Sequence, residues 1–358
     1  MKQRFFAPGR TELAGNHTDH QLGRVLAASV DAGISALVTP REDNVIVVAS
    51  EGFAAFRVDL DSLAPRAEEV GTSQALVRGV ASAMAERGGQ LCGFSAEVST
   101  TIPPGGGLSS SAAFEILFGR ILNALANGGR FDAPTLARIA QRAENLHFGK
   151  PSGLMDQLAC ATDGAVYVDF ATDAVRSVPA CFDALGYTLS LTNTGGSHAG
   201  LTDAYAEIPA DMRGVAARFG CSVLAEADES AFRAAYVPSR ENDRALHFFE
   251  ENARVPRMAE ALEARDIGTY LTLMNASGRS SERLLRNIRA ANGDDLLERG
   301  LALAARLLEG KGAWRVHGGG FAGCVQALCP TPEFEAYRAA MDAAFGPGAC
   351  MPLHIANA

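Results

Sequence analysis

The pattern of hydrophobic and polar positions predicts strands in the first half of the chain. Segments 25–38 and 44–49 are rich in β-branched residues and end at turn-forming residues, which is typical of strands. Segment 94–102 alternates apolar and polar residues, as a strand with one buried face does. Similar patterns predict helices at 74–86, 109–125 and 135–148, and further strands at 165–169 and 187–192.

The character of the sequence changes after residues 194–196. From there, apolar positions recur at helical spacing in a sequence rich in Ala, Arg and Glu. We therefore expect an α+β protein with a boundary within 180–195, and we divide the chain into domains 1–190 and 191–358. The second half is expected to contain helices at 240–252, 257–264, 267–275, 280–291 and 296–308, and a strand–glycine–strand unit at 314–328.

Composition limits the class of protein. A chain of 358 residues that is 47% hydrophobic and 20% charged is long enough for two packed domains and is not disordered. Its net charge of −9 argues against a nucleic-acid binder, which needs a basic surface, but does not exclude a single bound nucleotide.

The cysteines and the hydropathy indicate a cellular location. The seven cysteines are odd in number and form no CxxC pair, which favours free thiols in a reducing cytosol. The N-terminus has too short an apolar run for a signal peptide, and no segment approaches the roughly 18 apolar residues of a membrane span. We therefore expect a soluble, cytoplasmic protein.

The strongest local motif is PPGGGLSSSA at 103–112, where a predicted strand leads through three glycines into a helix. Glycine permits positive φ and close approach of the backbone to a ligand. The N–H groups of the first helical turn and the helix dipole favour a phosphate there. No Lys follows the glycines, so this is not a Walker A loop. The alternative is a glycine-rich turn with Ser109 or Ser110 as helix N-cap.

A second motif, ENLHFGKPSGLMDQ, occupies 144–157. A helix carrying Glu144 is expected to end near Gly149, and a tight loop then leads to Asp156 in an apolar context. A carboxylate there could accept the proton of a substrate hydroxyl or orient that hydroxyl. Glu144 could hold Mg²⁺, which prefers oxygen ligands. Alternatively, Asp156 is an N-cap and Glu144 a solvated helix residue.

Two further segments are unusual. RVHGGGFAGC at 315–324 has four glycines beside an apolar strand. This indicates either a loop pressed against a ligand or against the other glycine loop, or a tight hairpin. Near the N-terminus, polar side chains of the kind that bind a hydroxyl-rich substrate follow a short predicted strand. They are Arg10, Glu12, Asn16, His17, Thr18, Asp19 and His20.

These four motifs occur in the order found in the GHMP kinases, and the chain resembles the galactokinases most. GRTELAGNHTDH at 9–20 is similar to their GRxNxIGEHTDY, 103–112 to PxGGGLSSSA, and 149–157 to GxPxGxMDQ. His198 and Tyr205 keep the spacing of a further stretch, TNSxxxH…Y. The resemblance implies a two-domain GHMP kinase fold. Its N-terminal domain is ribosomal-protein-S5-like, its C-terminal domain is ferredoxin-like, and the active site lies in the cleft between them.

The resemblance also implies roles for individual residues. Asp156 is the catalytic base or the hydroxyl-orienting carboxylate, and Arg10 beside it stabilises charge on the transferring phosphoryl group. Mg²⁺ lies at Glu144 and Ser111, with Ser110 as the alternative. The sugar is contacted by Asn16, His17, Asp19, Gly153 and Tyr205. The ATP phosphates are bound by Gly105, Gly106, Gly107, Leu108, Ser109, Ser110 and Ser111.

The chain departs from the galactokinase pattern where the sugar is read. Asn16 replaces the Glu that reaches the 6-hydroxyl in galactokinases, and His20 replaces a Tyr. The sequence Asp19-His20-Gln21 is similar to DHQ in the plant galacturonokinases. We expect ATP-dependent formation of galactose 1-phosphate by a monomer or weak dimer that binds neither nucleic acid nor membrane. A kinase for a C6-altered galactose such as galacturonate is the alternative, and a non-catalytic sugar sensor is the second.

Overall fold

The computed structural model describes residues 2–196, 202–289, 293–321 and 323–356.

The chain forms two compact units, neither of which is one continuous stretch of sequence. Strands β1 (Gln3–Ala14) and β2 (Arg24–Pro40) each contribute to both units. The expected division into domains 1–190 and 191–358 stays a prediction. Unit 1 comprises Met1–Arg10, Ala28–Pro103 and Leu108–Asp163, and unit 2 comprises Thr11–Ala27, Pro104–Gly107 and Gly164–Ala358.

The sheet of unit 1 has the strand order β4 (Phe56–Asp59), β3 (Val45–Ser50), β5 (Phe94–Thr100) and β2. Strand β2 runs antiparallel to β5, whereas β3 runs parallel to β5. Because parallel strands need a crossover connection, the chain passes through a helix between β4 and β5. The strands predicted in this part of the chain are confirmed.

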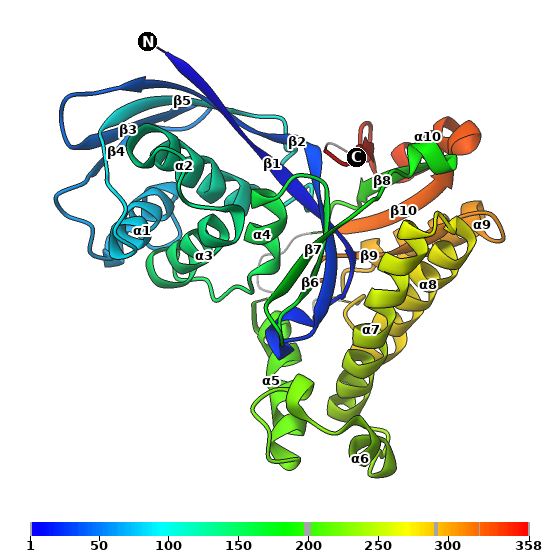
Figure 1. Ribbon diagram of the computed structural model, residues 1–358. Coiled ribbons are helices and arrows are strands. Elements are labelled where there is room, and N and C mark those ends of the chain that lie inside the picture. The colour runs from blue at the N-terminus through cyan, green and yellow to red at the C-terminus, as the bar shows by residue number, and fades with distance from the viewer. Residues whose placement is uncertain (1, 197–201, 290–292, 322, 357–358) are drawn as a thin grey trace. The chain divides into compact units, whose positions relative to one another are not determined.

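Four helices gather on one side of this sheet (Figure 1). Phe118, in the second of them, stacks on Phe94 of β5 with ring centroids 6.1 Å apart, and both side chains are fully buried. This contact fixes the helix that follows the glycine motif against the sheet. The helices are α1 (Ser73–Glu86), α2 (Ser110–Asn127), α3 (Ala133–Ala143) and α4 (Met155–Ala161).

The helix predicted at 135–148 changes type in its last turn. Helix α3 ends at Ala143, and the chain continues as a π-helical turn over Glu144–Phe148. Gly149, at φ 83°, then terminates the helical backbone. π-turns within helices are rare and occur often at functional sites.

Unit 2 contains a second sheet, antiparallel throughout, with the strand order β11-β8-β10-β9. Cys324 lies opposite Asn193 on one side and opposite His317 on the other. The strand–glycine–strand unit predicted at 314–328 is confirmed. The strands are β8 (Tyr187–Asn193), β9 (Ala313–His317), β10 (Cys324–Pro330) and β11 (Cys350–Leu353), and β6 (Ala165–Asp169) forms an antiparallel hairpin with β7 (Ala174–Val178).

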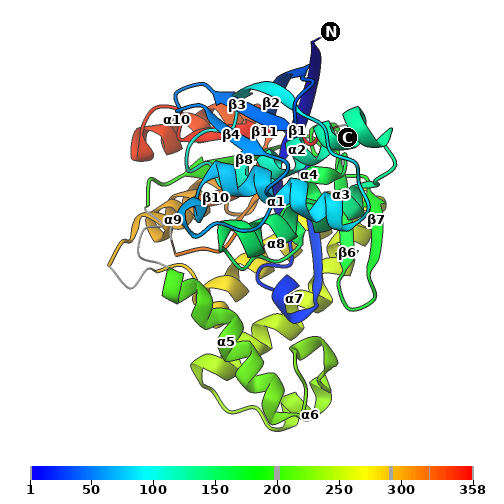
Figure 2. The ribbon, with the colours of Figure 1, turned by 90° about the vertical axis from the view of Figure 1, so that its left-hand side faces the viewer.

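The helices of unit 2 are α5 (Thr202–Arg218), α6 (Glu229–Ala234), α7 (Arg240–Glu263), α8 (Ile267–Ser280), α9 (Leu296–Leu308) and α10 (Phe334–Phe345). Figure 2 shows α5 and α6 at the end of this unit away from β8 and β10. One hydrophobic cluster of the unit buries Met212, Phe248 and Phe321, and another buries Val316, Val325 and Met341.

Two helix predictions in this unit are wrong. Segments 240–252 and 257–264 form the single helix α7, which continues through Pro256. Proline removes one intrahelical hydrogen bond, but Val255, Met258 and Ala259 around it are fully buried, and this packing outweighs the local cost.

The second error is the helix predicted at 280–291. Helix α8 extends to Ser280 and a π-turn follows over Ser281–Leu285, but Arg286 adopts left-handed φ 58° and ends the helical backbone. Helix α9 covers the residues predicted for it. Short helical turns lie at Asp19–Gln21, Ala67–Glu69, Asp183–Leu185, Leu224–Glu226 and Thr331–Glu333.

Two expectations from composition bear on the described residues. All seven cysteines are free thiols. Across residues 2–196, 202–289, 293–321 and 323–356, no helix is long and apolar enough to cross a bilayer.

Candidate functional site

Asp156 of unit 1 is held between two donors. It lies in the first turn of α4, where Arg10 Nε donates to Oδ1 at 2.6 Å and the Ser109 hydroxyl donates to Oδ2 at 2.6 Å. The Arg10 side chain is only 8% exposed, but that of Asp156 is 30% exposed. The carboxylate is therefore fixed by buried or half-buried partners and remains open to a ligand. The N-cap of α4 is Leu154, so the alternative reading of Asp156 as an N-cap is wrong.

A backbone contact ties the strand carrying Arg10 to the glycine–serine loop. The Arg10 amide donates to the Leu108 carbonyl at 3.1 Å. A Cβ on Gly9 would lie 2.8 Å from that same carbonyl oxygen, closer than side-chain carbons approach. Glycine at position 9 therefore allows the loop to lie against the strand, and Arg10 and Ser109 reach Asp156 from these two segments.

Ser109 occupies the N-cap position of α2 but does not act as the expected cap. Its backbone is left-handed at φ 52°, and its hydroxyl is donated to Asp156. Among the described residues, no side chain caps the N-terminus of α2. The first N–H groups of a helix have no partner within it, so this N-terminus suits an anion.

The charge of Asp156 is set by opposing effects. Burial raises its pKa, but the Arg10 guanidinium and the hydrogen bonds from Arg10 and Ser109 together outweigh burial and lower the pKa to about 2. The carboxylate is therefore ionised at neutral pH and only weakly basic. Such a group orients a hydroxyl by accepting its hydrogen bond more readily than it removes the proton.

Glu144 lies in the π-turn after α3 and is 1% exposed, so its alternative reading as a solvated helix residue is wrong. The Ser111 hydroxyl donates to Oε1 at 3.1 Å, and Lys150 Nζ lies 3.0 Å from the same oxygen. Gln157 Nε2 donates to Oε2 at 2.8 Å. These contacts hold the carboxylate beside the first turn of α2.

The oxygens of Glu144 and Ser111 fit Mg²⁺. A carboxylate and a hydroxyl within 3.1 Å of each other are hard oxygen donors. Among the described residues, no group of three or more His, Cys, Asp or Glu could hold a metal ion. A protein site with one carboxylate is normal for Mg²⁺, which retains waters and binds the phosphates of its substrate.

A second buried carboxyl, Glu115, lies near this site on α2. Its side chain is fully buried, and Gln157 Nε2 donates to its Oε2 at 3.2 Å. Burial, reinforced by the charge of Glu144, raises the pKa of Glu115 to about 9. Glu115 therefore carries a proton at neutral pH.

In unit 2, helix α7 holds the segment that follows β1. Glu251 Oε1 accepts from the Gly15 amide at 3.1 Å, and His247 Nε2 donates to the Asn16 carbonyl at 2.9 Å. Glu251 also pairs with Arg254. Burial raises the pKa of Glu251, but the charge of Arg254 and its other partners lower it to about 2. The segment is thus fixed by buried groups of a helix far away in sequence.

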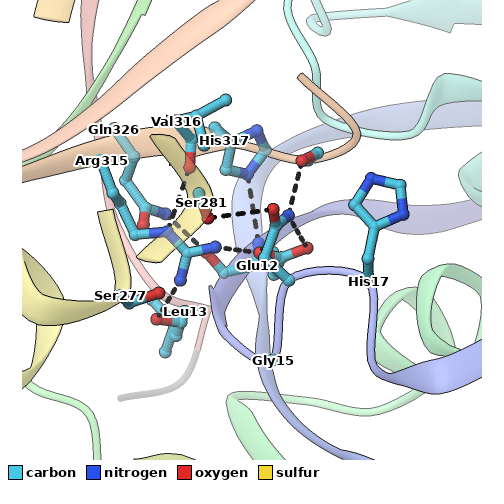
Figure 3. Close-up of polar contacts among 12 residues, drawn as sticks. Glu12, Leu13, Gly15, His17, Ser277, Ser281, Arg315, Val316, His317 and Gln326 are labelled. Atoms are coloured by element: carbon cyan, nitrogen blue, oxygen red, sulfur yellow. Dashed lines mark hydrogen bonds and ion pairs between the residues drawn. The ribbon is translucent and has the colours of Figure 1, made fainter. Parts of the chain in front are cut away.

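The side chain of Asn16 is 1% exposed and is part of a buried polar network (Figure 3). Its Nδ2 donates to the Gly318 carbonyl at 2.6 Å and to Glu12 Oε1 at 3.2 Å. Glu12 in turn forms an ion pair with Arg315, whose side chain is fully buried. Figure 3 shows Glu12 and Arg315 facing each other, with the ring of His17 set apart.

His17 and His20 belong to a chain of hydrogen bonds that fixes both rings as neutral. His17 Nε2 donates to the Gly319 carbonyl at 3.1 Å, so His17 Nδ1 accepts from His20 Nε2 at 3.3 Å. Gln21 Oε1 accepts from the Leu224 amide, so Gln21 Nε2 donates to His20 Nδ1 at 3.3 Å. Burial lowers the pKa of His17 to about 4 and that of His20 well below its usual value.

The other expected sugar residues lie as follows. Asp19 Oδ1 accepts from the His20 amide at 2.9 Å. The Tyr205 hydroxyl donates to the Gly320 carbonyl at 2.6 Å, and burial raises its pKa to about 12. Gly153 lies half-buried in the loop before α4 of unit 1. His198 lies outside the described residues.

The three glycines of the phosphate motif belong to unit 2. Gly105 and Gly107 adopt the positive φ predicted for them, at 67° and 69°. A Cβ on Gly107 would meet Cys324 Sγ and His317 Nδ1 at 3.2 Å. The glycine loop therefore lies against the strand–glycine–strand unit of β9 and β10, as one of the two readings of that unit predicted.

Comparisons with known proteins agree with the motifs. Residues 75–164 match the family described as GHMP kinases N terminal domain, and residues 2–40 match the galactokinase galactose-binding signature. A galactokinase of Streptomyces coelicolor is 32% identical over 351 residues, which cover 95% of this chain and 87% of the relative. One from Mycobacterium tuberculosis is 33% identical over 340 residues, covering 92% of this chain and 90% of the relative.

This chain belongs to the galactokinase family. Lactococcus lactis galactokinase, solved with galactose, superposes with a TM-score of 0.87 at 26% identity, covering 99% of this chain and 94% of that one. A mevalonate kinase superposes with a TM-score of 0.71 at 15% identity, covering 99% of this chain and all of that one, which shows the shared fold alone. The expected α+β GHMP kinase fold is thus confirmed.

Within the galactokinase pattern GRxNxIGEHTDY, this chain shows a reciprocal exchange. The pattern has Asn where this chain has Glu12, and Glu where this chain has Asn16. The two side chains hydrogen-bond to each other. This chain therefore has one carboxylate and one carboxamide at these two positions, in the opposite order to the pattern.

Sequence reasoning missed several residues of this galactokinase-family site. Lys150 and Gln157 were not singled out, although both lie in the second motif and bind Glu144. Glu115 had a readable signal, because it interrupts the apolar positions of helix 109–125 close to Phe114 and Phe118. The ion pair of Arg315 had no local signal in the sequence, because its partner Glu12 is about 300 residues away.

Proposed function

We propose that this chain is an ATP-dependent kinase that phosphorylates the anomeric hydroxyl of galactose and forms galactose 1-phosphate. The curated relatives that cover nearly its whole length are galactokinases, and this supports the reaction class. The observation that carries the proposal is the ionised carboxylate of Asp156, which is held between Arg10 and Ser109. Ser109 lies at the N-terminus of α2, the helix end that is suited to phosphate.

In this proposal, Asp156 accepts a hydrogen bond from the anomeric hydroxyl and aims its oxygen at the γ-phosphorus of ATP. The new oxygen–phosphorus bond forms as the bond to the β-phosphate oxygen breaks and ADP leaves. The hydroxyl proton passes late to the Asp156 carboxylate, which releases it to solvent. A pKa of about 2 favours this orienting role of Asp156 over that of a strong base. Phosphoryl transfer depends mainly on positioning and charge stabilisation.

We assign two roles to Arg10. Its guanidinium keeps Asp156 ionised, and its positive charge stabilises negative charge on the transferring phosphoryl group. The phosphates of ATP would be bound by Gly105–Ser111. Ser111 and Glu144 would hold Mg²⁺, whose charge offsets that of the phosphates when it is bound.

Sugar recognition is assigned to His17, Asp19, Gly153 and Tyr205. The two neutral imidazoles, His17 and His20, place no positive charge beside the substrate. The family resemblance implies a sugar contact for Asn16 as well. We also propose that the chain acts in the cytoplasm as a monomer or weak dimer, bound to neither nucleic acid nor membrane.

A C6-altered galactose such as galacturonate is the second candidate substrate. It is favoured by one observation: the side chain at position 16 is an amide, so this position presents no carboxylate to repel one on the substrate. A non-catalytic sugar sensor is less consistent with the site, because Arg10, Asp156, Ser111 and Glu144 are all present and in contact with partners.

An assay of ADP release over a sugar panel tests the proposal. We expect the highest kcat/KM with galactose, a lower value with galacturonate, and no ADP release without sugar. Higher kcat/KM with galacturonate than with galactose would overturn the choice of substrate. Sugar binding without any ADP release would favour the sensor.

A further inference from the structure

The carboxamide of Asn16 has no hydrogen-bonding capacity left. A primary amide has two N–H donors and two acceptor positions. The donors are taken by the Gly318 carbonyl at 2.6 Å and by Glu12 at 3.2 Å. The oxygen accepts from Asn287 Nδ2 at 3.0 Å and from Ser281 Oγ at 3.3 Å.

The network itself fixes which end of the amide is which. Glu12 and the Gly318 carbonyl can only accept, so the nitrogen of Asn16 must face them. Glu12 is in turn fixed by its ion pair with Arg315, which also donates to the Leu13 carbonyl at 3.0 Å. A carboxylate at position 16 would face both the Glu12 carboxylate and a carbonyl oxygen, which is strongly unfavourable in a buried site.

The same network holds the glycine loop Gly318–Gly320, whose three successive carbonyls each accept from a side chain. Asn16 donates to the first, and Asn287 and His17 each donate to the second at 3.1 Å. Tyr205 donates to the third. The loop is closely fitted, because a Cβ on Gly320 would lie 2.1 Å from the Asn287 carbonyl oxygen.

We propose that Asn16 is a positioning residue: it ties the glycine loop Gly318–Gly320 to the segment that carries His17 and Asp19, and it does not contact the sugar. The Glu12–Arg315 ion pair is the anchor of this tie. Sugar selection at this segment then rests on His17 and Asp19, whose placement Asn16 determines. The kinetic tests of this inference use galactose and its analogues, so they rest on the proposed function.

Substrate analogues separate positioning from contact. Galactose deoxygenated in turn at C2, C3, C4 and C6 is compared with galactose for the wild type and for Asn16→Asp. If Asn16 positions the segment, kcat/KM falls about 100-fold for galactose, and it falls by the same factor, within about threefold, for every analogue. If Asn16 contacts a hydroxyl, the analogue lacking that hydroxyl loses much less, and the proposal is overturned.

A charge-exchange variant tests the coupling. Glu12→Gln combined with Asn16→Asp removes the contact between two carboxylates, so the double variant should recover about tenfold of the lost kcat/KM. Recovery stays partial because the Gly318 carbonyl still lacks its donor. Additive losses in the two variants would contradict the proposal. Asn242→Asp, the same change at a surface position of α7, is the matched control.

Two further measurements keep the test decisive. Ser281→Ala removes only one donor to Asn16 and should leave a folded protein, in which the KM for galactose rises a few fold and the KM for ATP stays unchanged. An unchanged KM for galactose would count against the proposal. If the wild type does not phosphorylate galactose, the proposed function fails, and melting temperatures of the Glu12 and Asn16 single and double variants still test the coupling.

Discussion

At the residue scale, the chemistry depends on how a few side chains set one another's charge. Arg10 and Ser109 keep Asp156 ionised in a half-buried position, and burial keeps Glu115 protonated beside Glu144. Within unit 1, Asp156 is thus ionised because of its charged and hydrogen-bonding partners, whereas Glu115 is neutral because of burial. Perturbed pKa values of this kind mark functional sites, because active sites use burial and charge to prepare their groups.

Arg10→Gln should lower kcat and move its acid limb upward. Without the guanidinium, burial dominates and raises the pKa of Asp156, so the carboxylate becomes protonated at a higher pH. We expect kcat to fall about 100-fold at pH 7.5 and its acid limb to move up by about one pH unit or more. The check is a pH–rate profile with saturating galactose and ATP.

Arg41→Gln is the control for this change, because Arg41 pairs with Asp43 on the surface. Its profile should match that of the wild type. An acid limb that does not move in Arg10→Gln would contradict the role given to Arg10. For the wild type, the depressed pKa of Asp156 adds stability that is present above pH 4 and lost as the pH falls towards 2.

The residue scale also shows where sequence reasoning stops. The family resemblance of the motifs predicts functional roles for Arg10, Glu144 and Asp156. Nothing in the local sequence predicts that Ser109 turns from the helix to Asp156, since that follows from its left-handed backbone. Contacts such as Glu12 with Arg315 depend on the tertiary fold and have no local signal.

At the element scale, local patterns predict most helices and strands of the described residues, and two helix predictions are wrong. Segments 240–252 and 257–264 are predicted as separate helices, but they form the continuous helix α7. There, burial of the residues around Pro256 outweighs local propensity. A helix is predicted at 280–291, but the left-handed backbone of Arg286 ends it.

Helix α2 carries a buried acid, and this predicts a pH-dependent stability. Because the folded-state pKa of Glu115 is raised to about 9, folding takes up a proton above the unfolded pKa near 4.5. The contribution of Glu115 to the free energy of unfolding is therefore complete below pH 4.5 and is lost as the pH rises towards 9. Between pH 6 and 8 the loss is about 3 kcal/mol for one proton.

Glu115→Gln should remove this dependence. The measurement is the free energy of unfolding in urea at pH 6 and pH 8, with EDTA present. The wild type should lose about 3 kcal/mol more than the variant over this range. Glu97→Gln, at an exposed site on β5, is the control and should follow the wild type. Parallel pH dependence of the wild type and Glu115→Gln would show that the buried acid is not protonated.

At the scale of the whole molecule, the residues to which we assign roles are divided between the two units. Unit 1 contains Arg10, Asp156 and the Ser111–Glu144 pair, and unit 2 contains the glycine loops and the segment with His17 and Asp19. The motifs at 9–20 and 103–112 contribute residues to both units, whereas 144–157 lies in unit 1 and 315–324 lies in unit 2. No single motif therefore contains all the proposed functional residues, and only their combination indicates the function.

The central claim is that Asp156 directs transfer of a phosphoryl group from ATP to the anomeric oxygen of galactose. The most direct test is ³¹P NMR of the product formed by the wild type and by Asp156→Ala under the same conditions with galactose, ATP and Mg²⁺. We predict galactose 1-phosphate from the wild type and a rate at least about 1,000-fold lower from the variant. Phosphate on another oxygen, no phosphorylated sugar from the wild type, or an equal rate from both proteins would contradict the account.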